Sequence, residues 1–449
     1  MSPVPVVGPL PVVTLDGITD TTVPPGVRIV AVRRPNVPLV QLRLHFPLGD
    51  VGLRDTVPLR LLPKMLLAGT GARSGSEIAA SLQRLGILAG AGADVDHLSI
   101  SAGVPADSLT DGVDELVDIV AHPSFPRREV LGERERVVQE VLQEAVDPIA
   151  IATHALSGRL FPRHPYSDPL PEVGAVRRTG RARLSRFHTE HVVPAGCLLV
   201  AVGDVDPERL AVVAQSAFAR FGGSDVDDAG LGASTRPALP VPAFVAGGQP
   251  ALLVHRPGAV QSNLRVGVRC ADRHDPAFPA LFLAATVFGG QFTSRLVDNL
   301  RERHGYTYSP RAGIEERQLA ASFVVKAEVG TEVTGAALNE VRYELARMAT
   351  TDVTAEELES ARRYVNGVLA MAAATQAGLA GMLGAFVSYG LEPTYLERFT
   401  RELAEVDARS LRAAAERFLG PAAMTTVVVG DAEIVTAPLE AMGDVTVVK

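Results

Sequence analysis

The stretch VRIVAVRRPNVPLVQLRLHF, from Val27 to Phe46, alternates apolar and polar residues on both sides of a polar turn. Alternation with a period of two is typical of strands that bury one face, so the stretch predicts two strands. The pattern returns in ALLVHRPGAVQSNLRVGV, from Ala251 to Val268. Leu42 then aligns with Leu264, which lies about half the chain further on. This return indicates an internal duplication.

Helical patterns recur in the same way between the strands. Apolar residues return at three and four positions in SEIAASLQRLG, where Ser76 and Glu77 suggest a helix start, and in LTDGVDELVDIVAH. RERVVQEVL (134–142) is echoed by RRYVNGVL (362–369). Strands and helices interspersed within each copy predict an α+β fold. We expect two homologous α/β-sandwich domains, each a mostly antiparallel sheet with helices on one face, forming a clam-like pair.

The two copies are joined by a segment without periodicity. GGSDVDDAGLGASTRPALPVPAFVAGG (222–248) is rich in Gly, Pro, Ser and Asp, a composition typical of a solvated linker. We therefore expect a first domain over residues 1–225, a linker over 226–248 and a second domain over 249–449.

Composition limits the classes of function. With 47% hydrophobic and 21% charged residues the chain is predicted to be globular. A net charge of −8 gives no electrostatic reason to expect binding to nucleic acid or to an anionic membrane, since both need a basic face; a local basic patch is left open. Cys197 and Cys270 lie far apart in strand-like runs, which favours free thiols over a disulfide. The start of the chain has no basic region typical of a signal peptide, so the expected location is the cytoplasm.

Several segments together carry a family resemblance. In order along the chain they are MLLAGTGARSGSEIAASLQRLG, VAHPSF, ERERVVQEVLQEAVDP, LFPRHPYSDPLPEVGAV, FHTEHVVPAGCLLVAVGDVDPERL and FGGQFTSRLVDNLRERHGYTYS. In this order and spacing the chain resembles the short members of the insulinase, pitrilysin and mitochondrial processing peptidase superfamily of inverted zincins. The resemblance implies a zinc peptidase fold in two related halves.

Active relatives carry H-x-x-E-H just before the Met-Leu-x-x-Gly-Thr segment, because two histidines one helical turn apart hold zinc and the glutamate acts as general base. In LRLLPKMLLAGT (59–70) these positions fall on residues 60–64. Arg60 and Lys64 are cations without a lone pair to donate. Pro63 cannot accept a proton and, outside a first turn, disturbs a helix. We expect no metal in this chain.

The resemblance places the family's third zinc ligand on Glu140 and a supporting glutamate on Glu133. The alternative interpretation is that both glutamates are ordinary solvent-exposed residues of a helix. If the alignment holds, Arg60 and Lys64 face these two acids, and we hypothesise that the side-chain cations replace the charge of the metal. The sequence FHTEH offers a second pair, His188 and His191, but their spacing and the position of Glu190 do not fit a metal site, which favours structural histidines.

The second half retains a different motif. Arg301 precedes Tyr308 by seven residues in LRERHGYTY, and the resemblance implies that this pair grips the substrate backbone and steadies the tetrahedral intermediate. Arginine can donate charge-assisted hydrogen bonds to a peptide carbonyl, and a tyrosine hydroxyl can donate to an oxyanion. A surface arginine and a strand tyrosine are the alternative. The Asn-Ala pair of active relatives is replaced by Gly90 and Ala91.

Two functions remain open from the sequence. The first is a non-catalytic subunit of a heterodimeric zinc metallopeptidase, inactive alone, whose H-x-x-E-H partner would supply the zinc while this chain supplies Arg301 and Tyr308 to an unfolded or extended peptide. The second is a purely structural or binding subunit similar to the core proteins of respiratory complexes. An unrelated enzyme chemistry has no support, since the sequence contains no P-loop, dinucleotide fingerprint or nucleophile elbow.

Overall fold

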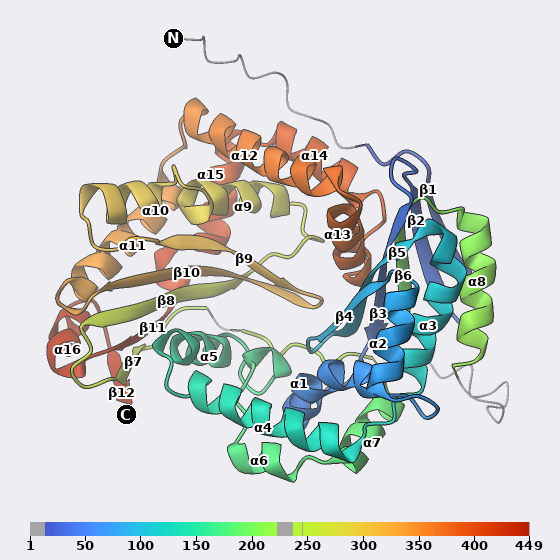
Figure 1. Cartoon of the computed structure of the whole chain (residues 1–449). Helices are drawn as coiled ribbons and strands as arrows, with labels where there is room; N and C mark the ends of the chain where they lie inside the picture. The colour runs from blue at the N-terminus through green and yellow to red at the C-terminus, as the bar shows by residue number, and fades with distance from the viewer. Residues whose placement is uncertain (1–13, 222–236, 245, 449) are drawn as a thin grey trace, which may run out of the picture.

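The computed structural model describes residues 14–221, 237–244 and 246–448, which form two halves that each contain a six-stranded mixed sheet. The strand orders are β1-β2-β6-β3-β5-β4 in the first half and β12-β7-β11-β8-β10-β9 in the second (Figure 1). The strands of the first sheet are β1 (Ile18–Val23), β2 (Val27–Arg33), β3 (Leu39–Pro47), β4 (Leu88–Ala93), β5 (His97–Pro105) and β6 (Leu198–Gly203). Those of the second are β7 (Ala251–His255), β8 (Gln261–Cys270), β9 (Arg311–Arg317), β10 (Ala320–Gly330), β11 (Thr425–Gly430) and β12 (Val445–Val448).

Helices surround both sheets. The first half contributes α1 (Thr56–Met65), α2 (Gly75–Arg84), α3 (Leu109–Ala121), α4 (Arg127–Glu144), α5 (Pro148–Leu160), α6 (Val173–Arg178), α7 (Arg181–His191) and α8 (Pro207–Ala219). The second contributes α9 (Phe278–Ala285), α10 (Arg295–Val297), α11 (Thr334–Thr350), α12 (Ala355–Ala374), α13 (Gln376–Ser388), α14 (Tyr395–Glu405), α15 (Ala408–Leu419) and α16 (Ala432–Glu440). The predicted cap of α2 is displaced, because Ser74 rather than Ser76 forms the capping box with Glu77.

The internal duplication is visible in the register of the strands. Leu42 on β3 pairs with Ala201 on the antiparallel strand β6, and Leu264 on β8 pairs with Val428 on the antiparallel strand β11. In both halves the next strand outward, β2 or β7, runs parallel to that neighbour. The predicted α+β fold with two related, mostly antiparallel sheets is therefore confirmed.

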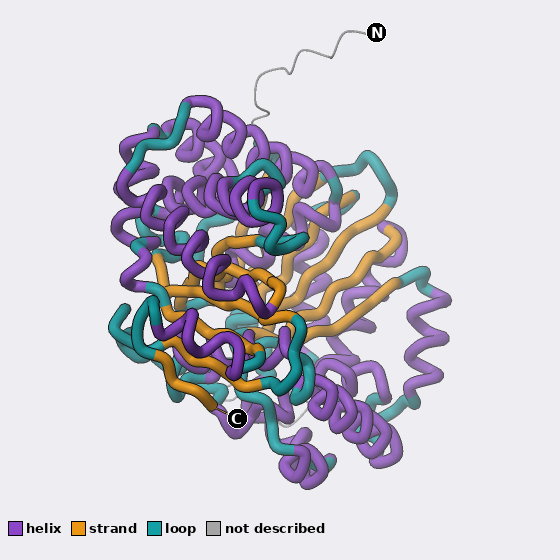
Figure 2. Tube along the Cα trace, turned by 90° about the vertical axis from the view of Figure 1, so that its left-hand side faces the viewer, coloured by secondary structure: helices purple, strands orange, loops and turns teal. Residues whose placement is uncertain are grey.

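Each half covers one face of its sheet with its own helices and sends one helix to the opposite half. Helix α13 of the second half packs against β3 and β6, while α5 of the first half packs against β8 and β11. Figure 1 shows α5 beneath β8 and β11 and α13 beside the strands of the first sheet. Figure 2 shows the strands in the middle of the molecule with helices around them. The sequence predicted helices on one face of each sheet only, because no local pattern indicates that a helix leaves its own half.

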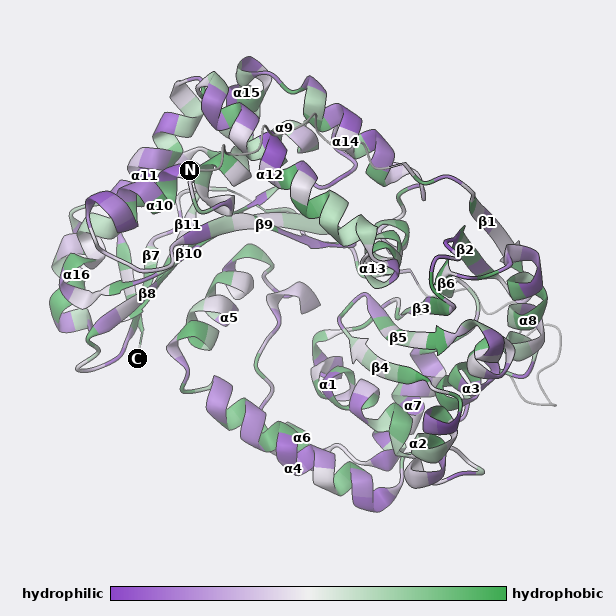
Figure 3. Ribbon diagram, turned by 45° about the horizontal axis from the view of Figure 1, so that its top comes forward, coloured by the Kyte–Doolittle hydropathy of each residue, from purple (hydrophilic) through white to green (hydrophobic). Residues whose placement is uncertain are grey.

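The apolar character of α13 fits this position. Its sequence QAGLAGMLGAFVS is almost without polar residues, and Figure 3 shows it as a largely hydrophobic helix beside the first sheet. Val30, Val200 and Val202 of the first sheet accordingly belong to the same buried cluster as Leu379 and Leu383 of α13. Burial of apolar area across the two halves joins them into one unit.

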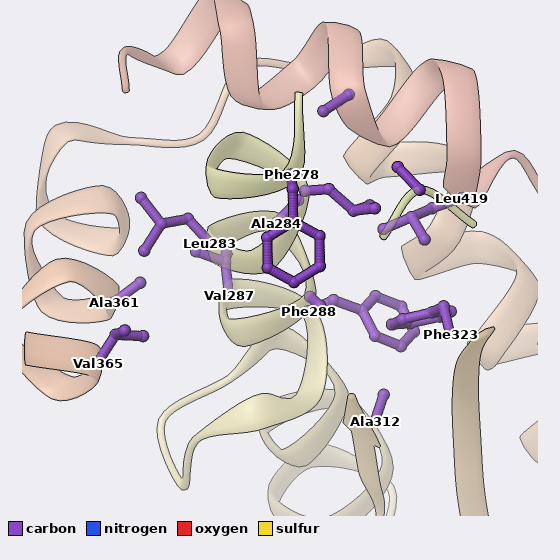
Figure 4. Close-up of a cluster of buried hydrophobic side chains, with 14 of the residues drawn as sticks. Phe278, Leu283, Ala284, Val287, Phe288, Ala312, Phe323, Ala361, Val365 and Leu419 are labelled. Atoms are coloured by element: carbon purple, nitrogen blue, oxygen red, sulfur yellow. The ribbon is translucent and has the colours of Figure 1, made fainter. Parts of the chain in front are cut away.

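The second half has a core built around α9 and the π-helical turn Thr286–Gly290 that continues it. Phe278, Leu283 and Phe288 are fully buried there against β10, α12 and α15 (Figure 4). The helical stretch Phe278–Arg303 is long and apolar enough to cross a membrane, but 78% of its apolar window is buried inside the protein. The predicted domain boundary at residue 225 lies outside the described residues, as does part of the predicted linker, residues 226–248.

Candidate functional site

Helix α1 holds the five positions of the family's zinc motif. It buries Leu61, Leu62 and Met65 against the core of the first half, and this orientation leaves Arg60 and Lys64 on the opposite side, toward α4. Pro63 lies within the helix, beyond its first turn. The helix continues to Met65 and then tightens into a 3-10 turn, Leu66–Ala68.

The two cations on α1 form ion pairs with two carboxylates on α4. The Lys64 Nζ atom lies 2.5 and 2.7 Å from the two carboxylate oxygens of Glu140. Arg60 donates from both terminal nitrogens to Glu144 at 2.8 to 3.1 Å. Because residues four apart lie on one helical face, the two pairs form a ladder between the helices. The positions that the resemblance assigns to zinc ligands therefore carry ion-paired side chains.

Only part of the hypothesised pairing is formed. Lys64 meets Glu140 as expected, but Glu133 bonds to Arg136 of its own helix instead of a cation on α1. The sequence reasoning missed Glu144, the partner of Arg60. A signal for it existed, because Glu144 follows Glu140 at the same four-residue spacing that separates Arg60 from Lys64.

The surroundings of Glu144 keep this acid ionised. Burial alone would raise its pKa, but hydrogen bonds and charge from Arg60, with a smaller contribution from His154, lower the pKa overall. His154 Nε2 lies 3.5 Å from the Glu144 carboxylate, and its Nδ1 lies 2.7 Å from the backbone carbonyl of Asp168. The site is a self-neutralised polar cluster.

The donor chemistry of this site does not fit zinc. Both carboxylates accept hydrogen bonds from cations that cannot ligate a metal, and a divalent ion there would face the charges of Arg60 and Lys64. Over residues 14–221, 237–244 and 246–448 no group of three or more His, Cys, Asp or Glu side chains could hold a metal. The FHTEH histidines are structural, since His188 and His191 are buried and bond to the backbone carbonyls of Val120 and Leu48.

A cavity of about 400 Å³ lies between the two halves next to this cluster. Arg60 and Leu59 of α1, the β4–β5 turn, and the last residues of β9 line it. At its edge the buried Asp96 accepts hydrogen bonds from the Tyr166 hydroxyl at 2.6 Å and from the backbone of Gln318 at 3.1 Å. Burial raises the pKa of Asp96. No pattern in the sequence indicated this polar link between the halves.

The second-half motif forms an exposed stack of arginine and aromatic rings. Arg301 lies in a π-helical turn, Asp298–Arg303, with its guanidinium 4.7 Å from the ring centre of Tyr308 and 5.0 Å from that of Phe292. Tyr308 is 78% exposed and Phe292 is 68% exposed. π-helical turns occur frequently at functional sites. The structure thus brings Arg301 and Tyr308 together and adds Phe292, which the sequence reasoning missed.

Buried polar contacts fix the backbone that carries Arg301. Arg295 forms a bidentate ion pair with Glu357 of α12 at 2.6 and 2.9 Å, and the Asn299 amide donates to Glu340 and Glu344 of α11 at 2.9 Å. The hydrogen bonds from Arg295 and Thr354 overcome the effect of burial and lower the pKa of Glu357 to about 2.

The two sites lie at opposite ends of β9. The Arg301–Tyr308 stack precedes the first residue of this strand, whereas its last residues line the cavity beside Arg60. Seven residues of strand span about 23 Å. The stack is therefore too distant to complete the ion-paired site of its own chain.

Comparison with known proteins places both halves of the chain in one family. Residues 60–171 match the family model described as Insulinase (Peptidase family M16), and residues 180–365 match the model described as Peptidase M16 inactive domain. The chain belongs to the insulinase family. Curated insulinase-family relatives include an uncharacterized zinc protease of Mycobacterium bovis, 25% identical over 89% of this chain and 90% of that protein. Another uncharacterized zinc protease, from Streptomyces coelicolor, is 23% identical over 90% of this chain and 87% of that protein.

Solved structures show the same fold. The peptidase M16 inactive domain from Pseudomonas fluorescens has a TM-score of 0.82 at 24% identity and covers 92% of this chain and 98% of that one. A protease from Helicobacter pylori has a TM-score of 0.83 at 16% identity, covering 93% of this chain and all of that one. This insulinase-family member therefore has the two-domain fold, and Arg60 and Lys64 on its α1 helix form ion pairs with α4.

Proposed function

We propose that this chain is the non-catalytic subunit of a heterodimeric zinc metallopeptidase. The observation that carries the proposal is the contrast between its two sites. The motif positions 60–64 hold cations bound to carboxylates, whereas Arg301 and Tyr308 form an exposed stack at the far end of β9 from these ion pairs. A stack of this kind suits a site completed by another subunit.

In the proposed complex, a homologous partner with an intact H-x-x-E-H helix holds the zinc and the general base. Arg301 donates hydrogen bonds to the carbonyl oxygens of an extended peptide, and the Tyr308 hydroxyl donates a hydrogen bond to the oxyanion that forms during attack. The surface exposure of Tyr308, 78%, leaves its hydroxyl accessible to a second molecule. This chain contributes substrate contacts, and the partner contributes the metal.

The test is peptide cleavage by the zinc-bearing partner mixed with variants of this chain. Tyr308→Phe should lower kcat by about 10² to 10³ with a modest change in KM, because one oxyanion donor is lost. Arg301→Ala should also weaken substrate binding. Tyr343→Phe is the matched control, since Tyr343 is 54% exposed and also lies under an arginine, Arg347, at 5.7 Å. Gel filtration checks that every variant still forms the complex.

Full activity of both Tyr308→Phe and Arg301→Ala in an intact complex would overturn this proposal. It would favour the alternative of a purely structural subunit, which the replacement of the family's Asn-Ala pair by Gly90 and Ala91 on the edge strand β4 also favours. Metal analysis provides an independent test. The isolated chain should contain no stoichiometric zinc, and one zinc per chain that disappears in Glu140→Gln would contradict the proposed division of roles.

A further inference from the structure

An apolar pocket of about 250 Å³ lies on the second half, between α9 with its π-helical turn, β9 and α12. Phe282, Ile314, Tyr364, Val368 and Leu369 line it, and Val365 and Ala312 on its floor belong to the core shown in Figure 4. Tyr364 and Val368 are about half exposed at its rim. Exposed apolar surface over a recess marks a binding site more often than scattered apolar residues do.

The internal duplication makes this pocket the counterpart of the ion-paired site. The alignment that superimposes Leu42 on Leu264 places Phe282 at the position of Arg60 and Thr286 at the position of Lys64. The alignment of the later helices, Val141 with Val368, places Gly367 and Met371 at the positions of Glu140 and Glu144. All four charged side chains of the first half are thus replaced by uncharged residues, and the space that ion pairs fill in one half stays open in the other.

The pocket adjoins a strand edge that can bind a peptide. Ala312, Gly313 and Ile314 of β9 line it, and β9 is the last strand in the order of its sheet. A side chain built on Gly313 or Gly367 would meet no atom of the described residues within 4 Å, so both backbones border open space. An edge strand presents unpaired backbone groups that an extended peptide can pair with, and the side chains of such a peptide alternate between the two faces.

The same edge is continuous with the proposed substrate contacts. Gly290 lines the pocket, and Phe292, two residues later, packs on the guanidinium of Arg301. We infer that the pocket holds an apolar side chain of the extended peptide whose backbone meets Arg301 and Tyr308, so that this chain selects substrates with a bulky apolar residue at that position. The inference rests on the proposed function for the identity of the peptide, but it concerns binding by this chain alone.

Binding of a designed peptide to the isolated full chain tests the pocket. The probe is a blocked, fluorescein-labelled peptide of about ten residues with one leucine in a Ser/Gly/Thr background, long enough to run along β9. Its partner peptide has serine in place of leucine. By fluorescence anisotropy, the leucine peptide should bind about tenfold to a hundredfold more tightly, as expected when one apolar side chain leaves water.

Val368→Asp should abolish this preference, because it places a carboxylate at the rim of the pocket. Val368 is 49% exposed, so the fold has room for the change, and Val212→Asp at a 68% exposed position on α8 is the matched control. The inference about the pocket would be overturned if the wild-type chain bound the two peptides equally, or if Val368→Asp kept the preference for leucine. If cleavage nevertheless falls in Tyr308→Phe, the proposed function stands without it; if the preference holds while Tyr308→Phe cleaves normally, the pocket stands and the proposed function fails.

Discussion

At the scale of single residues, the ion-paired cluster between α1 and α4 shows how exposure sets the strength of each ion pair. Lys64 and Glu140 keep 34% and 47% of their side-chain surface exposed, and Arg60 and Glu144 keep 21% and 31%. Water therefore screens the first pair more strongly than the second. We therefore expect the bidentate Arg60–Glu144 contact to contribute more to the free energy of unfolding than the Lys64–Glu140 pair.

We expect Lys64→Met to lower the free energy of unfolding by no more than about 1 kcal/mol, because exposed pairs are worth little. Arg60→Met should cost more, about 1 to 3 kcal/mol, since it leaves a partly buried carboxylate without the three charged hydrogen bonds that it accepted from Arg60. Urea denaturation of each variant, with Glu140→Gln and Glu144→Gln for double-mutant cycles, measures both values. A coupling above about 3 kcal/mol between Lys64 and Glu140 would show that this pair is shielded from water.

A second residue-scale effect concerns acid stability. Burial lowers the pKa of His45 to about 4, with smaller contributions from His97 and Arg43. Within the part of the chain that the structure describes, the buried Nε2 atom of His45 has no hydrogen-bond partner. A histidine whose pKa is lowered on folding stabilises the fold above its unfolded pKa, about 6.5, and loses that contribution as the pH falls through its folded value.

The wild-type chain should accordingly lose about 3 kcal/mol through His45 between pH 6.5 and pH 4. His45→Met removes the titrating group, so its stability should fall less steeply over this range. Urea denaturation at several pH values compares the two, and His274→Met at an exposed position serves as the control. Identical pH profiles for His45→Met and the wild type would show that His45 does not titrate in this interval.

At the scale of elements, α13 illustrates how small residues allow a helix to lie on a sheet of the opposite half. A Cβ atom on Gly384 would lie 2.5 Å from the Nε2 atom of His45 on β3. One on Gly381, a turn earlier in the same helix, would meet no atom within 4 Å among residues 14–221, 237–244 and 246–448. The glycine at 384 is thus required by close approach. The glycine at 381 is not.

Gly384→Ala should therefore destabilise the protein by about 1 to 3 kcal/mol, the usual cost of overpacking. Gly381→Ala should be neutral or stabilising by up to about 1 kcal/mol, because alanine has the better helix propensity. Thermal and urea unfolding of the two variants provide the comparison within one helix. Equal effects of the two substitutions would mean that His45 and β3 can shift to make room for an added methyl group on α13 at little cost in stability.

At the scale of the whole molecule, the duplicated halves exchange equivalent helices. Helix α5 follows α4 as α13 follows α12, and each crosses to the two corresponding strands of the other sheet, β8 and β11 or β3 and β6. Leu156 and Leu160 of α5 pack against Val324 and Val427 of the second sheet. Neither half can bury both faces of its own sheet alone.

Residues 1–236 and 237–449 expressed separately should each fail to unfold cooperatively, because each would expose an apolar sheet face and an apolar helix. Expressed together, the two fragments should copurify in equal amounts. Circular dichroism during urea unfolding and gel filtration measure these outcomes. A fragment that is monomeric and unfolds cooperatively alone would contradict the view that the exchange of helices holds the molecule together.

Local patterns in the sequence were enough to determine the fold class, the duplication and the loss of the metal donors. The alternation in Val27–Phe46 and its return in Ala251–Val268 depend on neighbouring positions only, so they are readable without a structure. The same holds for residues 60–64, whose side-chain chemistry excludes zinc ligation wherever the helix lies. The sequence also placed Arg301 and Tyr308 in one motif.

Tertiary structure alone decided which residues meet. Glu144 rather than Glu133 pairs with Arg60, although the two partners are 84 residues apart in the sequence. The orientation of α4 about its own axis decides which of its carboxylates face α1. The hydrogen bond from Tyr166 to Asp96, the stacking of Phe292 on Arg301 and the open pocket beside β9 depend likewise on how distant elements dock. Sequence periodicity specifies the face that an element buries, but the partner of that face follows from packing of the whole chain.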